Sequence, residues 1–252
     1  MTGTRKYGLA ELTFEEAKAV LARGAVAFLP TGATEAHGPH LPLSTDVVIS
    51  TEAARRAARL IESGGGTALV LPAIAYAVTE FAADFSGTVS LPIETARALV
   101  RDVILGAIRT GFRGVVVCNA HLEPGNLQAL REAVEEATAR GARCAFPDVT
   151  RKPHALRLGE EFKSGACHAG SYETSLVLAA DPFLVQSELA DHLEPNPTSL
   201  SVAIRAGKRS FLEAGGPRAY FGDPRAASAM EGETLYAELA DIFATAAREL
   251  TA

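Results

Sequence analysis

The chain has 252 residues, of which 48% are hydrophobic and 21% charged, and its formal net charge at pH 7 is −6. This length favours one large domain over residues 1–252, and the acidic balance gives no electrostatic footprint of a protein that binds nucleic acid or anionic membranes. The apolar runs reach only strand length, residues 1–7 carry no apolar signal core, and the three cysteines show no paired spacing. The composition therefore predicts a cytoplasmic protein without a transmembrane span, a disulfide framework, or a nucleic-acid or membrane partner.

Helix-like and strand-like segments alternate along the chain, as they do in an α/β protein. Apolar residues recur at helical spacing in residues 14–22, 47–61, 93–108, 127–139 and 234–250. Short apolar runs predict strands at residues 25–30, 68–72, 114–118 and 143–146. Residues 188–216 are rich in Pro, Gly and polar side chains, so this stretch could be a substrate lid or an oligomer contact.

The loop after the first predicted strand gathers two carboxylates and two imidazoles. They are Glu35, His37, His40 and Asp46. Gly38 and the prolines at positions 39 and 42 prevent a regular helix, so these side chains lie on an irregular loop at the end of a strand, where open α/β sheets bind ligands. Oxygen and nitrogen ligands without thiolates suit a divalent metal such as Zn or Mn. Either imidazole could be a ligand by residue type, but Pro39 should turn the two to different sides.

A second cluster, His121 and Glu123, follows the strand predicted at residues 114–118. In extended backbone this spacing lets both side chains point the same way. Either cluster alone could be an ordinary loop, but neighbouring parallel strands would bring the two together in one crevice. The five candidates, Glu35, His37, Asp46, His121 and Glu123, exceed the three protein ligands of a catalytic zinc. They fit two metals about 3.5–4 Å apart, with one bridging carboxylate and a hydroxide between them.

A third segment, residues 167–175, supplies a candidate for proton transfer. His168 stands just before a predicted helix with Ser171 as its N-cap, where the helix dipole lowers the pKa of an imidazole. Glu173 in the first turn is explained equally well as a partner of that dipole. Cys167 could be a nucleophile, but a small inert thiol is the favoured interpretation.

These segments resemble the signature blocks of the creatininase (creatinine amidohydrolase) family. The blocks read TEAHGPHLPLSTD, NAHLEPGN and CHAGSYETSLVL, followed by GDPRAASAMEG near the C-terminus. The resemblance covers residues 25–232 and implies a three-layer α/β/α fold with a mostly parallel central sheet, and a dinuclear metal hydrolase that assembles as a homohexamer. It implies that Glu35 and His121 hold one metal, that His37 and Glu123 hold the other, and that Asp46 bridges both. It further implies His168 as the acid that protonates the leaving nitrogen, with Glu123 as the second catalytic residue, and it leaves His40 outside the metal ligands.

Two departures from the family pattern bear on the substrate. The chain has no tryptophan, whereas creatininases close tryptophans over the creatinine ring, and Cys167 stands where they tend to have Glu. In the loop of residues 76–88, Thr79, Glu80 or Ser86 could bind a substrate or simply belong to a surface loop. The sequence therefore predicts hydrolysis of a C–N bond in a small cyclic, formyl or peptide-like amide, with two divalent ions (Zn, Mn or Fe) and a metal-bridged hydroxide. The alternatives are a lactone or C–C hydrolase at the same site and a non-catalytic metal-binding scaffold.

Overall fold

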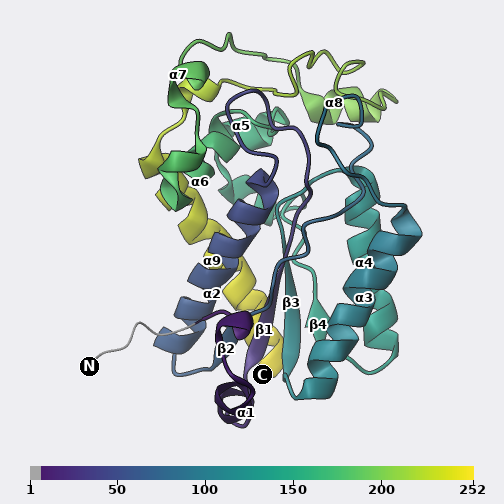
Figure 1. Cartoon of the computed structure of the whole chain (residues 1–252), viewed down its shortest axis with the longest axis vertical. Coiled ribbons are helices and arrows are strands. Elements are labelled where there is room, and N and C mark those ends of the chain that lie inside the picture. Colours follow the sequence, from purple (N-terminus) through teal and green to yellow (C-terminus); the bar gives the residue numbers. More distant parts are fainter. Residues whose placement is uncertain (1–6) are drawn as a thin grey trace.

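A computed structural model describes residues 7–252 and has a parallel four-stranded sheet between two layers of helices (Figure 1). The strands are β1 (Val26–Thr31), β2 (Ala68–Val70), β3 (Gly114–Asn119) and β4 (Cys144–Ala145), in the order β2-β1-β3-β4. In the central pair, Val26 lies opposite Gly114 and Thr31 opposite Asn119. The predicted three-layer α/β/α fold with a parallel central sheet is therefore confirmed. Most of the N-terminal segment in which no signal core is expected lies outside the described residues.

Helices cover both faces of the sheet, so its strands are apolar on both sides. One face carries α2 (Thr45–Ser63), α6 (Ser171–Ala180) and α9 (Ala229–Thr251), and the other carries α3 (Ile93–Thr110) and α4 (Pro124–Ala139). Phe28 of β1 packs with the first group, whereas its neighbour Leu29 packs with the second. Successive side chains of a strand point to opposite faces, so each short strand contributes side chains to two hydrophobic cores.

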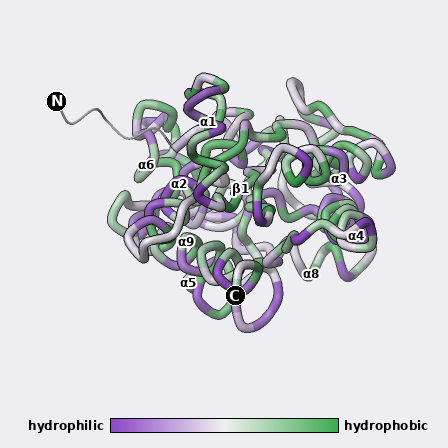
Figure 2. Tube along the Cα trace, turned by 90° about the horizontal axis from the view of Figure 1, so that it is seen from below, coloured by the Kyte–Doolittle hydropathy of each residue, from purple (hydrophilic) through white to green (hydrophobic). Residues whose placement is uncertain are grey.

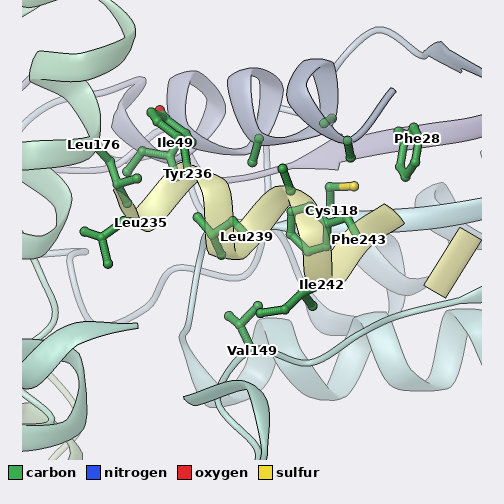
Figure 3. Close-up of a cluster of buried hydrophobic side chains, with 14 of the residues drawn as sticks. Phe28, Ile49, Cys118, Val149, Leu176, Leu235, Tyr236, Leu239, Ile242 and Phe243 are labelled. Atoms are coloured by element: carbon green, nitrogen blue, oxygen red, sulfur yellow. The ribbon is translucent and has the colours of Figure 1, made fainter. Parts of the chain in front are cut away.

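The core beneath α9 is built from large apolar side chains. Figure 3 shows Tyr236, Leu239 and Phe243 of α9 in one cluster with Ile49 of α2 and with Phe28 and Cys118 of the strands. Each such side chain, when fully buried, contributes about 1.5–3 kcal/mol to stability. Along the peripheral helices hydrophilic and hydrophobic residues alternate (Figure 2), as expected where one helix face is buried and the other is exposed.

Short elements complete the end of the molecule at which the strands terminate. Helices α5 (Gly159–Ser164), α7 (Ser187–Ala190) and α8 (Leu200–Arg205) lie beyond the carboxyl ends of the strands, at the top of Figure 1. The remaining elements are α1 (Phe14–Leu21) and the 3-10 helices η1 (Leu9–Glu11), η2 (His154–Arg157), η3 (Pro182–Leu184) and η4 (Pro224–Ala226). None of the helices described is both long and apolar enough to cross a membrane.

Every predicted strand and long helix is present, but the bounds differ: β2 and β4 are shorter than predicted, α2 and α3 end two residues later, and three helices begin earlier. Helix α9 begins five residues before the predicted Thr234, because the Ser228 hydroxyl accepts a hydrogen bond from the Glu231 amide and caps it. Helix α2 begins at Thr45, so Asp46 lies in its first turn instead of in the preceding loop. This shift fixes the direction of the Asp46 carboxylate, which belongs to the site described next.

Candidate metal centre and active site

The carboxyl ends of β1 and β3 bring the first two predicted clusters together. Because Thr31 and Asn119 pair at the ends of these neighbouring strands, the loops that follow start side by side. Gly32 lets the first turn of α2 come close to the loop, since a Cβ at this position would lie 2.6 Å from the Asp46 Cβ. The Asp46 carboxylate then accepts a hydrogen bond from the Ala33 amide at 3.0 Å.

The His121 loop is held by two asparagines of the NAHLEPGN block. The Asn119 side chain donates to the His121 carbonyl at 2.6 Å, and the Asn126 side chain donates to the same carbonyl at 2.9 Å. The Asn119 side-chain oxygen also accepts from the hydroxyl of Thr31 at 3.1 Å. All of these groups are buried, so the network fixes the loop against the end of β1. Neither asparagine was among the functional residues predicted from the sequence.

Asp46 stands between two sets of possible metal ligands. Its Oδ1 lies 3.2 Å from His37 Nε2, and its Oδ2 lies 3.2 Å from His121 Nδ1. Glu35 Oε1 lies 3.1 Å from His121 Nδ1, and its other oxygen accepts a hydrogen bond from the Thr79 hydroxyl. Three of the five predicted ligands, Glu35, Asp46 and His121, thus form one compact group.

Glu173, not Glu123, completes the group around His37. Its Oε2 lies 3.6 Å from His37 Nε2, and His37, Asp46 and Glu173 form a second compact group. The Glu173 carboxylate also accepts a hydrogen bond from the Ala169 amide at 2.6 Å. A dipole partner was the competing interpretation of Glu173 in the sequence. The structure places its carboxylate in the cluster.

Glu123 lies beside this cluster without joining either group. Its two oxygens accept hydrogen bonds from the amides of Glu80 at 3.0 Å and Phe81 at 3.2 Å. Burial raises the pKa of Glu123 to about 7. Its side chain lines the same cavity as His121, so it faces any molecule that binds there.

Each imidazole of the cluster is oriented by a backbone carbonyl. His37 Nδ1 donates to the Glu35 carbonyl at 3.2 Å, and His121 Nε2 donates to the Val78 carbonyl at 2.8 Å. A carbonyl oxygen only accepts, so the other nitrogen of each neutral ring presents its lone pair to the carboxylates. Among residues 7–252, His37 Nε2 is buried without a hydrogen-bond donor, and the nearest carboxylate to it is that of Asp46 at 3.2 Å. Such an arrangement is repulsive unless a proton or a cation lies between the nitrogen and the oxygens.

The buried carboxylates of the site also favour the binding of a cation. Glu35, Asp46 and Glu173 are buried, and within residues 7–252 no Lys or Arg pairs with them. Burial raises the pKa of Glu173 to about 8. Burial by itself lowers the pKa of His37, but the charges of Asp46, Glu173 and Glu35 outweigh it and raise that pKa to about 10. Buried carboxylates with imidazole lone pairs directed at them are the donor set that divalent Zn, Mn or Fe prefers.

His168 lies over the cluster. Its ring contacts those of His37 and Phe211, with centroids 4.4 and 4.3 Å away. The Nε2 atom donates to the Ala36 carbonyl at 3.0 Å, which leaves Nδ1 facing Glu35 Oε1 at 3.8 Å. Burial and the neighbouring His37 lower the pKa of His168 to about 4. His168 also forms a possible metal group with Glu35 and His37, so its position suits either a ligand or a proton carrier.

Two residues near His168 had roles predicted from the sequence: Ser171 as an N-cap and Cys167 as a small inert thiol. Ser171 is not the N-cap of α6: Gly170 occupies that position, and the Glu161 carboxylate caps the helix by accepting from the Tyr172 amide at 2.8 Å. A Cβ on Gly170 would collide with this carboxylate, which is why a glycine stands there. Burial raises the pKa of Cys167 to about 12, so the thiol stays protonated and is a poor nucleophile.

His40 is directed away from the cluster, as expected from Pro39. Its Nε2 lies 2.9 Å from the Thr174 hydroxyl of α6, and its carbonyl accepts a hydrogen bond from the Gln186 amide at 2.8 Å. No possible metal group among the described residues contains His40. It therefore connects the loop of residues 32–44 with the helix that carries Glu173.

A cavity of about 480 Å³ opens above the cluster. Glu35, Asp46, His121 and Glu173 form its buried floor. Its walls are largely apolar and include Phe81, Leu122, Leu156, Phe162, Leu200, Ile204 and Phe211. Residues 188–216, which the sequence left open as a substrate lid or an oligomer contact, thus supply part of the cavity wall. Of the 76–88 loop only Phe81 lines the cavity, whereas the Thr79 hydroxyl is used to hold Glu35.

The sequence matches a known enzyme family over most of its length. The model of the family described as creatininase, creatinine amidohydrolase, matches residues 10–247. A protein of Mycobacterium ulcerans (strain Agy99) named mycofactocin precursor peptide peptidase is 34% identical over 219 residues, which cover 84% of this chain and 80% of that protein. Creatinine amidohydrolase of Pseudomonas putida is 31% identical over 204 residues, covering 72% and 75% respectively.

Solved structures share the fold. A crystal structure of creatinine amidohydrolase (creatininase) aligns with a TM-score of 0.76 and 26% identity over 98% of both chains. A structure described as "Creatininase Mn" aligns with a TM-score of 0.73 and 26% identity, covering 97% of this chain and 98% of the other.

Proposed function

Since this chain belongs to the creatininase family of hydrolases that act on C–N bonds, we propose that it cleaves a peptide-like amide with two divalent metal ions held by the buried cluster. The observation that carries the proposal is the position of Asp46, whose two oxygens face two separate sets of ligands. A carboxylate placed in this way suits a bridge between two metals.

We assign Glu35 and His121 to one metal, His37 and Glu173 to the other, and Asp46 to both. Glu173 replaces Glu123 in the ligand set implied by the family resemblance, because it is Glu173 that lies beside His37. When bound, a metal pair of this kind acidifies a water molecule and polarises the substrate carbonyl. Zn, Mn and Fe all accept these ligands, and a solved relative is described with Mn.

The residues around the cluster position the amide and transfer the proton. His168 holds its Nε2 proton on the Ala36 carbonyl, so Nδ1 is the atom that exchanges a proton with the departing nitrogen. Glu123 faces the cavity with both oxygens fixed by backbone amides, and its carboxylate is the second candidate for accepting a proton. The apolar walls exclude water from the region where the amide would bind.

Two observations favour a peptide-like substrate over creatinine. A cavity of about 480 Å³ is within the range of roughly 300–1,000 Å³ that accommodates drug-sized ligands. The chain also has no tryptophan to close over a flat ring. In agreement, the relative named as a peptide peptidase is 34% identical and the creatinine amidohydrolase 31%.

The proposal is tested with protein loaded with Zn or Mn and analysed for metal content. The substrates are N-acetylated di- and tripeptides, creatinine, a formamide and a lactone of similar size. We expect about two metals per chain and cleavage of a peptide bond. Turnover of creatinine or of the lactone alone would contradict the substrate class, and two bound metals without any turnover would support the scaffold alternative.

Replacing His168 with Ala should lower the turnover number by about 10²–10⁴-fold, because the group that protonates the leaving nitrogen is lost. The metal content should stay at that of the wild type. The matched control is His192→Ala, because His192 is exposed, does not line the cavity and hydrogen-bonds through Nδ1 to the Glu188 carbonyl. A fall in metal content in the His168 variant would instead identify His168 as a ligand.

A further inference from the structure

Three basic side chains line the cavity above the acidic floor. They are Lys152, Lys163 and Arg205, which come from the segment before η2, from α5 and from the end of α8. All three residues are exposed, whereas the cluster at the floor is buried, so the cations surround the mouth. This concentration of positive charge contrasts with the net charge of −6 of the whole chain.

Helix α8 is fixed in the position that brings Arg205 to the cavity. The Ser199 hydroxyl donates to the Ser164 carbonyl at 2.7 Å, and the Ser201 amide donates to the Gly165 carbonyl at 3.1 Å. Gly165 has a φ of 79°, and a Cβ at this position would collide with the Ser201 hydroxyl, so a glycine is needed for α8 to pack here. Leu200, Ser201, Ile204 and Arg205 have the spacing of one helix face, and all four line the cavity.

The three cations differ in whether an ion pair already neutralises their charge. Lys163 forms an ion pair with the exposed Glu160 at 2.8 Å. Lys152 and Arg205 form no ion pair within the described residues. Unpaired cations around a cavity with apolar walls attract anions and orient them as they enter. A molecule that spans the cavity would therefore meet metal ligands at one end, apolar side chains in the middle and positive charge at the other end.

We infer that the substrate carries a carboxylate at the end remote from the scissile amide, and that Arg205 and Lys152 recognise it across the apolar walls. The inference rests on the proposed function and narrows its substrate class to anionic peptide-like amides. The carboxylate is either the free C-terminus of a peptide or an acidic side chain, which offer the same chemistry to a guanidinium. Arg205 and Lys152 would then determine specificity without contacting the reacting atoms.

The test compares three probes with metal-loaded protein. They are N-acetyl-Leu-Phe-Ala as the free acid, the same peptide as its C-terminal carboxamide, and N-acetyl-Leu-Phe-Glu carboxamide, so that each carboxylate lies beyond the residue that follows the Leu-Phe amide. We expect kcat/KM for at least one acidic probe to exceed that for the neutral carboxamide by about tenfold, mainly through KM, and the preference to shrink as ionic strength rises. The probe that is preferred shows whether a C-terminus or a side chain is recognised.

Variants of the cationic residues at the mouth test whether these residues cause the preference for acidic probes. Arg205→Ala and Lys152→Ala should each reduce the preference several-fold, Arg205→Glu should reverse it, and Lys163→Ala should change it less because Glu160 already neutralises that charge. Turnover of the neutral probe should stay within about twofold. Lys208→Ala is the control, since Lys208 is an exposed cation of the same segment that does not line the cavity.

If none of the probes is cleaved, binding measurements still distinguish a failure of this inference from a failure of the proposed hydrolysis. The dissociation constants of the same probes are then measured by calorimetry on the metal-loaded wild type and on the Arg205/Lys152 double variant. Tighter binding of an acid that is lost in the double variant supports recognition at the mouth even if peptide hydrolysis fails. A preference that survives in the double variant means that the metals or another group bind the carboxylate, which overturns the inference, as does the absence of any preference in the wild type.

Discussion

Replacing Asp46 with Ala is expected to empty both metal positions and to abolish hydrolysis. Asp46 belongs both to the group with Glu35 and His121 and to the group with His37 and Glu173, and its oxygens lie 3.2 Å from nitrogens of His37 and His121. Because even indirect supports of metal ligands contribute about 10–100-fold to affinity, the loss of the bridging ligand should weaken each metal by more than about 100-fold. Elemental analysis after saturation with Zn or Mn and desalting measures this directly.

Thermal unfolding supplies a readout that is independent of activity. A metal that binds only the folded state stabilises it, so added Zn should raise the Tm of the wild type and should leave that of the Asp46 variant nearly unchanged. Asp102→Ala is the matched control, because Asp102 lies on α3 with 63% of its side chain exposed, and its ion pair among residues 7–252 is with the neighbouring Arg101. If the Asp46 variant retains one tightly bound metal and its activity, Asp46 is not a bridge and the two-metal proposal fails.

Replacing Glu173 with Gln should remove one metal and leave the other. The amide keeps the size of the side chain and can still accept the hydrogen bond from the Ala169 amide, but it loses the negative charge beside His37. We expect about one metal per chain and a fall in turnover of at least about 100-fold. Circular dichroism should show an unchanged fold, because the hydrogen bond that the side chain makes to the backbone is preserved.

Glu123→Gln is the informative comparison for this substitution. Both residues are buried or half-buried carboxylates that line the same cavity, but Glu123 lies outside both compact ligand groups. We expect the Glu123 variant to keep two metals and to lose activity only through its role in the cavity. The opposite pattern, with one metal in the Glu123 variant and two in the Glu173 variant, would restore the ligand set that the family resemblance implies.

The convergence of the first two clusters could be predicted from the sequence, because it depends on local features. Each cluster directly follows a short apolar run, and the carboxyl ends of neighbouring parallel strands lie at the same edge of a sheet. The turn of His40 away from His37 was likewise predictable, since Pro39 restricts the backbone between them. The order of helices and strands followed from hydrophobic periodicity, and only the bounds of the elements moved.

The position of Glu173 could not be predicted in the same way. It depends on how α6 docks, and the contacts that dock α6 come from distant segments. Glu161 of α5 caps the helix, and Gly232 allows α9 to pack closely at Ser175, where a Cβ would collide with the carbonyl. Neither contact leaves a local pattern around Glu173, so a carboxylate in a first helical turn was explained equally well by the helix dipole.

What the sequence determined by itself is the chemistry available at the ends of β1 and β3, because residue type and position relative to a strand are local properties. Only the tertiary structure decided which carboxylate joins His37, and which side chains surround the mouth of the cavity. Arg205 reaches that mouth because α8 packs on α5 through contacts at Ser199 and Gly165. The Ser199 hydrogen bond joins residues that are 35 positions apart in the sequence. Packing between distant segments sets such distances, and no short stretch of sequence encodes it.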